Sequence, residues 1–510
     1  MLTTILASII ALWNICPKGE TITLESPFVT DMIIVSDCDS QNMAPARNYS
    51  AGTLVDDMNR STVFAQTFDG SRGVRIIFDR RGENLLHRGD TVKFNFNGCS
   101  IHRDELTDAL TVRNLRPSSN ILSCKSGGIV VPKVKTLPEL RLSDINTFVK
   151  VIDLDVVFKN GSWYNIHEPY TIKMDGWASL LRSIDGRCIY MMLTNACDWR
   201  RTGKKLPQGA ISVSGVIVHE TNRRYGPDMG PFSIRPVFES DITVENAKTD
   251  WKTYCGWIKL EESGNNVTLE AVGTTEVPKK GVQDARIMND IGSALAYLWT
   301  DSKSSMMIHH GYNSLSTENQ GLVKNGAFLF YGKTVNWYEW EGDQVKGTKA
   351  FYLEVDTRKI KSGSAQFSFE WAAGTTDGNK SWYFPIDWVV ECSMDFNDWT
   401  LLTDAATGSP VIRLHSVPWK DTVIEESSHT KKMKAGYDTG MGEQQHSFIV
   451  PQDMLYASSV IYFRIRPAGT TVARVRSDVA DSYASAEVNR NNSGLRTWIR
   501  FDNILFDCKK

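Results

Sequence analysis

Residues 365–371, with the sequence Ala-Gln-Phe-Ser-Phe-Glu-Trp, alternate strictly between apolar and polar side chains. A period of two residues predicts a β-strand, because successive side chains of a strand point to opposite sides of the sheet. The two faces are unlike, with Ala365, Phe367, Phe369 and Trp371 on one and Gln366, Ser368 and Glu370 on the other. We therefore expect this stretch to be a strand of a sandwich or jelly roll.

The aromatic-rich region around this strand extends the same prediction. Residues 328–399 contain 17 aromatic residues in 72 positions, against 10% for the whole chain. Residues 387–392 alternate in the same way, and turn signals rich in Gly, Asp and Asn occur at 341–343, 361–363 and 377–379. Short strands between such turns favour an all-β sandwich or jelly roll.

Two groups of rings depart from simple alternation. The first is Trp337, Tyr338 and Trp340, and the second contains Trp382 and Tyr383. Consecutive aromatic residues in a strand point to both faces, so at least one ring of each group should face outward. We expect these rings to stack on a sugar ring, with Asp377 and Asn379 on the neighbouring loop binding its hydroxyl groups. The alternative is that the rings fill the core or a domain contact.

A glycoside hydrolase is the less favoured alternative. Glu339 and Glu341 would lie roughly 7 Å apart on an extended strand, within the range of about 5–9.5 Å that such enzymes need. Any acidic pair with this spacing gives the same distance, so we predict no catalytic residues.

The composition limits the partners. A chain of 510 residues is expected to form two to four domains. The formal net charge is −2 and the isoelectric point is near 6.5, which gives no electrostatic reason to expect a nucleic-acid partner. The nine cysteines show no zinc-type or redox-type spacing, so we expect buried free thiols, no metal and no cofactor.

The first residues have the spacing of an amphipathic helix, with apolar side chains at Leu2, Ile5, Leu6, Ile9, Ile10 and Trp13. No Lys or Arg precedes this run, and it is too short to span a bilayer. We expect the first helix of domain one here, rather than an export signal or a transmembrane segment.

The first half of the chain contains a diverged internal repeat. Two pairs of landmarks recur 116 and 120 residues apart: Asp69-Gly70 with Asp185-Gly186, and Gly89-Asp90 with Gly209, each ahead of an apolar strand. About five strands in each copy predict two barrels of the OB type.

The same region resembles the domain of unknown function 5689 family. The resemblance lies in residues 3–20, in Ile-Ile-Val-Ser-Asp at 33–37, in residues 66–78, in Arg-Gly-Asp-Thr-Val at 88–92, and in Ser-Ile-Arg-Pro-Val at 233–237 with residues 240–242. It covers residues 1–245 and implies an exported, often lipid-anchored protein of the Bacteroidetes type. The molecular role of the family is unassigned, and the resemblance implies no catalytic residues.

The second half is expected to begin with a connection. Residues 256–272 have the pattern of a hairpin, and residues 278–281 that of a linker. Residues 282–299 have a partly helical spacing. Residues 395–399 resemble a turn of discoidin-like and carbohydrate-binding sandwiches, and residues 497–506 resemble the last strand of jelly-roll modules of exported proteins.

Together these observations predict an OB-like barrel with an N-terminal helix over residues 1–140, a second OB-like barrel over 141–245, a hairpin and linker over 246–284, and a jelly-roll-like sandwich over 285–510. The predicted function is non-catalytic binding of a glycan at the outer-membrane surface or in the periplasm. The alternative that remains open is a scaffold that binds another surface protein and no small ligand.

Overall fold

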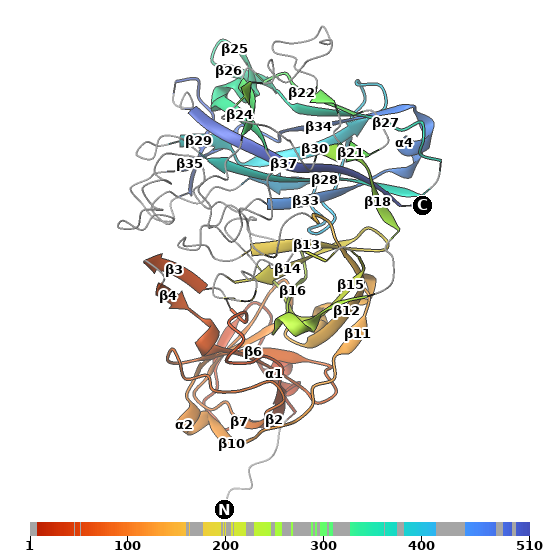
Figure 1. The fold of residues 1–510 in the computed structure, drawn as a ribbon. Helices are drawn as coiled ribbons and strands as arrows, with labels where there is room; N and C mark the ends of the chain where they lie inside the picture. Colours follow the sequence, from red (N-terminus) through yellow and green to blue (C-terminus); the bar gives the residue numbers. More distant parts are fainter. Residues whose placement is uncertain are drawn as a thin grey trace, which may run out of the picture.

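The computed structural model consists mainly of β-strands, arranged in three modules that follow one another along the molecule (Figure 1). In chain order they are two modules, named here the first and the second barrel, and a sandwich. The last strand, β37, ends beside the sandwich strand β18. The described residues are 8–44, 46–50, 53–159, 163, 177–194, 197, 199, 206–207, 209–220, 229–245, 250–257, 267–268, 287–288, 291–292, 296–302, 305–309, 327–361, 363–374, 382–414, 444–475, 483–491 and 496–509.

The first barrel is an eight-stranded sheet in the order β1-β8-β9-β6-β5-β2-β7-β10, with the separate hairpin β3–β4. Its alternating strands send Met32, Phe94 and Val112 into one apolar core. The strands are β1 (Thr21–Thr23), β2 (Val29–Ile34), β3 (Ala46–Ser50), β4 (Thr53–Asp57), β5 (Thr62–Gln66), β6 (Gly73–Phe78), β7 (Thr91–Asn95), β8 (Ser100–Arg103), β9 (Leu110–Leu115) and β10 (Ile121–Lys125), and the short helix α2 (Pro117–Asn120) precedes β10.

The expected N-terminal helix is present as α1 (Ala11–Ile15). Leu12 and Trp13 are buried in the first barrel's core, whereas Ile10 is exposed. The indole N–H of Trp13 donates to the carbonyl of Asp108, and Arg103 donates to the carbonyl of Trp13. These contacts fasten α1 to the barrel. The predicted positions Leu2, Ile5 and Leu6 lie outside the described residues.

The second barrel is closed by five strands. Its sheet runs β11-β12-β13-β14-β16-β15-β17, and an additional pairing of β12 with β15 completes the ring. The strands are β11 (Lys133–Lys135), β12 (Phe148–Val156), β13 (Trp177–Ser183), β14 (Cys188–Leu193), β15 (Ile211–Val218), β16 (Ser233–Arg235) and β17 (Ile242–Val244). Because β11 belongs to this sheet, the second module begins before the expected boundary at residue 140.

The two barrels share the topology that the internal repeat predicted. β5 and β6 form a hairpin across Gly70, and β13 and β14 form one across Gly186, both glycines having positive φ. The second strand of each hairpin then pairs in parallel with a later strand, β6 with β9 and β14 with β16. The pairing of β15 with β16 closes the second module into a ring, whereas the described strands of the first module share the other pairings without that closure.

The sandwich has two large sheets. One contains β19 (Val267–Thr268), β23 (Ser305–His309), β24 (Ala327–Lys333), β37 (Arg496–Lys509), β18 (Trp251–Trp257), β21 (Ile291–Gly292), β28 (Ser364–Gly374) and β33 (Gln444–Val450). The other contains β20 (Ile287–Met288), β22 (Ala296–Thr300), β27 (Phe351–Asp356), β34 (Val460–Pro467), β30 (Asp387–Ser393), β31 (Thr400–Leu401) and β32 (Val411–Arg413). Smaller elements are β25 (Tyr338–Glu341), β26 (Gln344–Thr348), β29 (Trp382–Pro385), β35 (Thr471–Val475), β36 (Tyr483–Glu487) and the helix α4 (Gln452–Ala457).

The apolar face predicted for β28 lines the core between these sheets. Phe367 packs 4.8 Å from Phe463 of β34, and Trp371 packs 5.6 Å from Trp388 of β30, both distances between ring centroids. All four predicted apolar residues, Ala365, Phe367, Phe369 and Trp371, are fully buried. The alternation therefore gave the correct inner face.

The connection expected at 246–284 has a different structure. β18 pairs with β37 and is a strand of the sandwich, so this module begins by Trp251. β19 pairs with β23, and most of the hairpin predicted over residues 256–272 lies outside the described residues. The partly helical spacing of 282–299 was also misleading, since its described residues include the strands β20, β21 and β22.

A tight junction joins the two barrels. The backbone N–H of Phe148 donates to the Gln66 side chain at 2.8 Å, and an apolar cluster containing Phe64, Phe148 and Val216 lies between the modules. A Cβ at Gly73 would lie 2.1 Å from the carbonyl oxygen of Asn146, so only glycine fits there.

A second junction buries the polar face of β28 against the second barrel. Arg182 of β13 is 2% exposed and donates to Asp507 at 2.9 Å and to Gln366 at 3.1 Å. Its guanidinium lies 4.3 Å from the centre of the Trp251 ring. The phenol of Tyr190 donates to the carbonyl of Gln445 at 2.7 Å. The sandwich therefore rests on the second barrel through β28, β33 and β37.

Candidate functional site

The structure corrects two of the predicted stacking rings. Trp337 and Tyr338 are each 2% exposed and belong to the sandwich core, where Trp337 packs 5.2 Å from Trp388. Trp337 ends the 3₁₀ helix η7 (Thr334–Trp337) and Tyr338 begins β25, so the alternation rule for strands does not apply across this pair. Burial also raises the pKa of the Tyr338 phenol far above its ordinary value. Neither ring can stack on a ligand.

The other predicted residues have mixed outcomes. Trp340 is partly buried, its indole N–H donates to the carbonyl of Val335 at 3.0 Å, and the Arg490 guanidinium lies 5.5 Å from its ring centre. Trp382 and Tyr383 lie in β29, but their side chains are outside the described part of the structure. Asp377 and Asn379 also lie outside the described residues.

A different set of rings lies on the outer face of the sheet β22-β27-β34-β30. This aromatic face consists of Trp299, Tyr352, Phe396, Trp399 and Tyr462. Phe396 occupies the middle, with ring centroids 5.2 Å from Tyr352, 5.2 Å from Tyr462 and 5.3 Å from Trp399. Trp299 is 7% exposed, and the other four rings are partly exposed. The face belongs to the sheet that does not rest on the second barrel.

The strands place these rings by alternation. In β27 the side chains of Phe351, Leu353 and Val355 enter the core, which leaves Tyr352 on the outer side. Trp299 is the direct partner of Tyr352 in the neighbouring strand, and the two rings stack at 5.3 Å. β22 and β27 thus supply two stacked rings, Trp299 and Tyr352, which form the floor of the aromatic face.

The loop after β30 places Phe396 and Trp399 over this floor. The Asp395 carboxylate accepts backbone N–H groups of Asn397 and Asp398 at 2.9 Å, which closes a tight turn and lowers the pKa of Asp395. Phe396 has φ of +64°, a conformation that a bulky residue adopts only when its surroundings hold it. Such backbone outliers cluster at binding sites.

An ion-pair group around the buried Glu391 supports the edge of the aromatic face. Arg466 donates to both oxygens of Glu391, at 2.8 and 2.9 Å, and Arg464 donates to the same carboxylate. The Arg464 guanidinium lies 4.1 Å from the Trp399 ring centre. Burial of Glu391 raises its pKa, but the hydrogen bonds from Arg466 and Arg464 outweigh that effect and the pKa is lowered. Glu391 therefore stays charged at neutral pH and holds Arg464 beneath Trp399.

Two sequence features point to this aromatic face, although the prediction assigned ligand binding to other rings. Phe351 and Tyr352 are consecutive aromatic residues in a strand, and there the expected division into one inward and one outward ring is correct. Residues 395–399, with the resemblance to a turn of carbohydrate-binding sandwiches, supply Phe396 and Trp399. The contribution of Tyr462 depends on the pairing of β27 with β34, which a local pattern does not give.

The acidic pair considered for catalysis is exposed. Glu341 is ion-paired with Lys346 at 3.0 Å, and a bulge in the β25–β26 pairing separates Glu339 from Trp340. Both residues have the environment of ordinary surface carboxylates.

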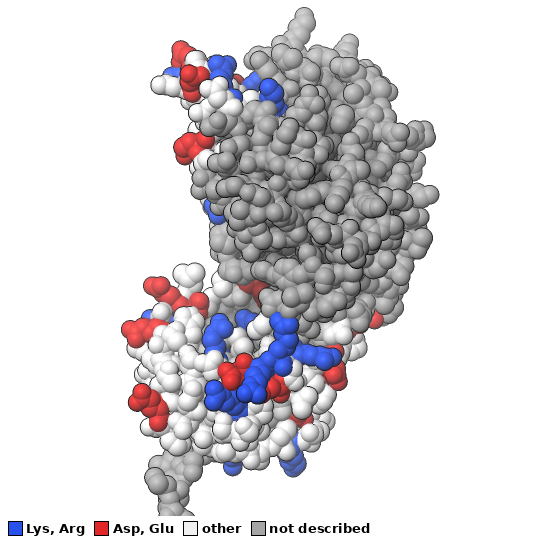
Figure 2. Space-filling model, turned by 90° about the vertical axis from the view of Figure 1, so that its left-hand side faces the viewer, with Lys and Arg blue, Asp and Glu red and all other residues white. Residues whose placement is uncertain are grey.

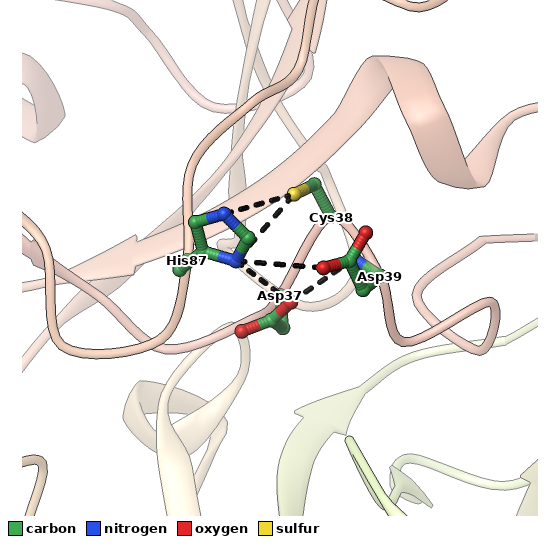
Figure 3. A group of neighbouring side chains, drawn as sticks. All are labelled: Asp37, Cys38, Asp39 and His87. Carbon is green, nitrogen blue, oxygen red and sulfur yellow. Dashed lines mark hydrogen bonds and ion pairs between the residues drawn. The ribbon is translucent and has the colours of Figure 1, made fainter.

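A second candidate lies at the end of the first barrel, where one atom from each of Asp37, Cys38, Asp39 and His87 lies within 4.8 Å of the others (Figure 3). His87 Nδ1 is 3.2 Å from Asp37 Oδ1 and 3.9 Å from Asp39 Oδ2, and Cys38 Sγ is 3.7 Å from the same nitrogen. Burial, together with the charges of Asp39 and Asp37, raises the pKa of the Cys38 thiol to about 11. Sulfur, nitrogen and oxygen donors in one group form a set that can hold a metal.

The remaining cysteines carry no such arrangement within the described residues. All nine thiols are free, and six of them are buried as expected, with Cys38 and Cys508 partly buried and Cys124 exposed.

Charge and helix length add two observations on partners. On the face of the molecule in Figure 2, Lys and Arg side chains on the barrel module have Asp and Glu among and around them. The described helices α1, α2 and α4 have five, four and six residues, too short to reach across a bilayer.

No protein-family model matches the chain, and no curated protein matches it.

Proposed function

We propose that this protein is a non-catalytic binding protein whose sandwich binds a glycan through the aromatic face. The observation that carries the proposal is the position of Phe396, a bulky residue with positive φ that is held among four other rings on the outer side of a sheet. Partly exposed rings in one place offer flat apolar surfaces to the C–H face of a sugar.

The polar groups around the rings suit a ligand with many hydroxyl groups. Asn397 and Asp398 are exposed on the same turn as Phe396, and the Asp301 carboxylate accepts from the Tyr352 phenol at 3.1 Å. Small-ligand sites usually combine apolar contact with a few polar groups that fix the ligand's orientation. Here Phe396 and Trp399 would stack on the sugar, and the turn would bind its hydroxyl groups. Trp340, Trp382 and Tyr383, with Asp377 and Asn379, are kept as a proposed second stacking position.

The barrels are proposed as a rigid spacer for this sandwich. Both junctions contain buried hydrogen bonds, through Phe148 with Gln66 and through Arg182 with Asp507. The resemblance of residues 1–245 to exported, lipid-anchored proteins supports a place at the outer-membrane surface or in the periplasm. The same rigidity also suits a scaffold that binds another surface protein, which is the second candidate function.

A thermal-shift screen of the whole chain against a panel of glycans tests the proposal. A ligand at a hundred times its dissociation constant should stabilise the protein by about 2.7 kcal/mol. Trp399→Ala should abolish the shift, and Phe68→Ala, which removes a 62% exposed ring from the first barrel, should leave it intact. A shift that survives in Trp399→Ala would exclude the aromatic face as the site.

A further inference from the structure

The group Asp37, Cys38, Asp39 and His87 comes from two loops that the sheet brings together. β2 and β7 pair antiparallel with Val29 opposite Asn95 and Ile33 opposite Thr91. Continued past the strand ends, this register places Asp37 opposite His87. Two backbone hydrogen bonds extend the pairing in that direction, from Ile34 N–H to the Asp90 carbonyl and from Gly89 N–H to the Ile34 carbonyl.

The separations of His87 Nδ1 from the other three donors are close to those around one tetrahedral ion. Bonds of about 2.0–2.3 Å to nitrogen, oxygen and sulfur place neighbouring ligand atoms roughly 3.3–3.8 Å apart. His87 Nδ1 is 3.2 Å from Asp37 Oδ1, 3.7 Å from Cys38 Sγ and 3.9 Å from Asp39 Oδ2. All four donors lie within 4.8 Å of one another. Cys38 Sγ is also 3.7 Å from Nε2 of the same ring, so closing the four donors around one ion requires rotation of the His87 and Asp39 side chains, which are 52% and 80% exposed.

The surrounding contacts hold the donors and leave a route for an ion. Asp37 is 9% exposed and accepts backbone N–H groups from Asp39 at 3.0 Å and from Arg88 at 3.1 Å. The backbone N–H of His87 donates to Asp90 at 2.8 Å. The side chains of His87 and Asp39 are 52% and 80% exposed, so solvent reaches the group directly.

The types of donor atom in this group indicate which class of metal ion it can bind. Calcium and magnesium take six or more oxygen ligands, and this group supplies a thiol and an imidazole among its four donors. Thiolate, imidazole and carboxylate together suit zinc and the neighbouring divalent transition metals. We propose that Asp37, Cys38, Asp39 and His87 form a four-ligand site for a divalent transition metal of the zinc type.

The same two loops also hold the second barrel, which gives the metal a structural role. Past Asp39, the Asn42 side chain donates to the carbonyls of Met192 at 3.1 Å and Pro236 at 2.8 Å. Beside His87, Arg88 donates to both oxygens of Asp241 at 2.8 and 2.9 Å. A metal that links the two loops fixes both attachments at once, so it tightens the junction between the barrels.

Cobalt titration of the whole chain, freed of metal with a chelator and reduced, tests the site. One Co²⁺ per chain should bind with the near-ultraviolet absorption of a cobalt–thiolate bond and the visible bands of a tetrahedral ion. Zn²⁺ should displace it and raise the melting temperature. Cys38→Ser and His87→Gln should each weaken binding by more than about 100-fold, since loss of a residue behind a ligand alone costs roughly 10–100-fold.

Matched variants separate this site from adventitious binding by other thiols and imidazoles. Cys508→Ser and His102→Gln change residues of the same types that are partly buried elsewhere, and both should keep the stoichiometry and the thiolate band. The proposal is overturned if Co²⁺ gives no thiolate band, if Cys38→Ser and His87→Gln bind as the unchanged protein does, or if either control variant loses the ion.

Discussion

Trp337 and Trp399 lie in the same aromatic-rich stretch and have different surroundings. Trp337 is 2% exposed in the core, whereas Trp399 is partly exposed above Arg464. Trp337→Ala should therefore lower the free energy of unfolding by about 3–5 kcal/mol, the usual range for a buried aromatic residue. Trp399→Ala should cost less than half of that.

Chemical denaturation of the two variants at neutral pH measures this difference. Equal losses for Trp337→Ala and Trp399→Ala would contradict the burial on which the assignment of the aromatic face depends. The comparison is matched, because both changes remove the same side chain from the same module.

The positions of individual aromatic residues could be predicted from the sequence only in part. Strand alternation gave the correct inward positions in β28, and β27 follows the same rule, since the backbone of both strands is regular. It was wrong at Trp337 and Tyr338, because the backbone changes there from a 3₁₀ turn to a strand. Aromatic composition alone could not distinguish a core ring from a surface ring.

Strands β30 and β34 are linked by the Glu391 carboxylate, which receives hydrogen bonds from Arg464 and Arg466. The lowered pKa of Glu391 means that this stabilisation is fully present above the unfolded value of about 4.5 and is lost as pH falls through the folded value. Glu391→Gln should cost about 1.5–3 kcal/mol at pH 7, and the gap from the unchanged protein should close in acid.

Thermal unfolding of both proteins over a pH series measures the effect. Glu341→Gln is the control, because its exposed pair with Lys346 should contribute less than about 1 kcal/mol. A cost for Glu391→Gln that stays constant into strong acid would contradict the proposed charge on this carboxylate.

Strand β28 has a polar face whose burial a local sequence pattern could not predict. Its polar residues Gln366, Ser368 and Glu370 were correctly placed opposite the apolar ones, yet they are 0%, 0% and 5% exposed. The second barrel covers them, and a polar face against another module has the same sequence pattern as a face against water. The group around His87 was missed for a similar reason, since Cys38 and His87 are 49 positions apart and meet through strand pairing.

The three modules of the whole molecule are joined by junctions with buried charges. Arg182 lies 2.9 Å from Asp507 and 3.4 Å from Asp155, and all three side chains are nearly or fully buried. Arg182→Ala leaves the buried Asp507 without this partner, while Asp155 keeps Lys159 at 2.9 Å. The change should therefore cost about 3–5 kcal/mol and loosen the sandwich from the second barrel.

Differential scanning calorimetry distinguishes this junction effect from a general loss of stability. Arg182→Ala should separate the unfolding of the sandwich from that of the barrels. Arg187→Ala, which removes the exposed partner of Asp185 from the same hairpin, should unfold as the unchanged protein does. One unshifted transition for Arg182→Ala would mean that the junction does not couple the modules.

The most direct test of the central claim is binding of the fluorescently labelled whole chain to a glycan array, beside Trp399→Ala and Phe68→Ala. We expect a restricted set of bound glycans, whose binding is lost in Trp399→Ala and kept in Phe68→Ala. An array with no bound glycan, or one on which Trp399→Ala binds like the unchanged protein, would contradict glycan binding at the aromatic face and leave the protein-binding scaffold as the better account.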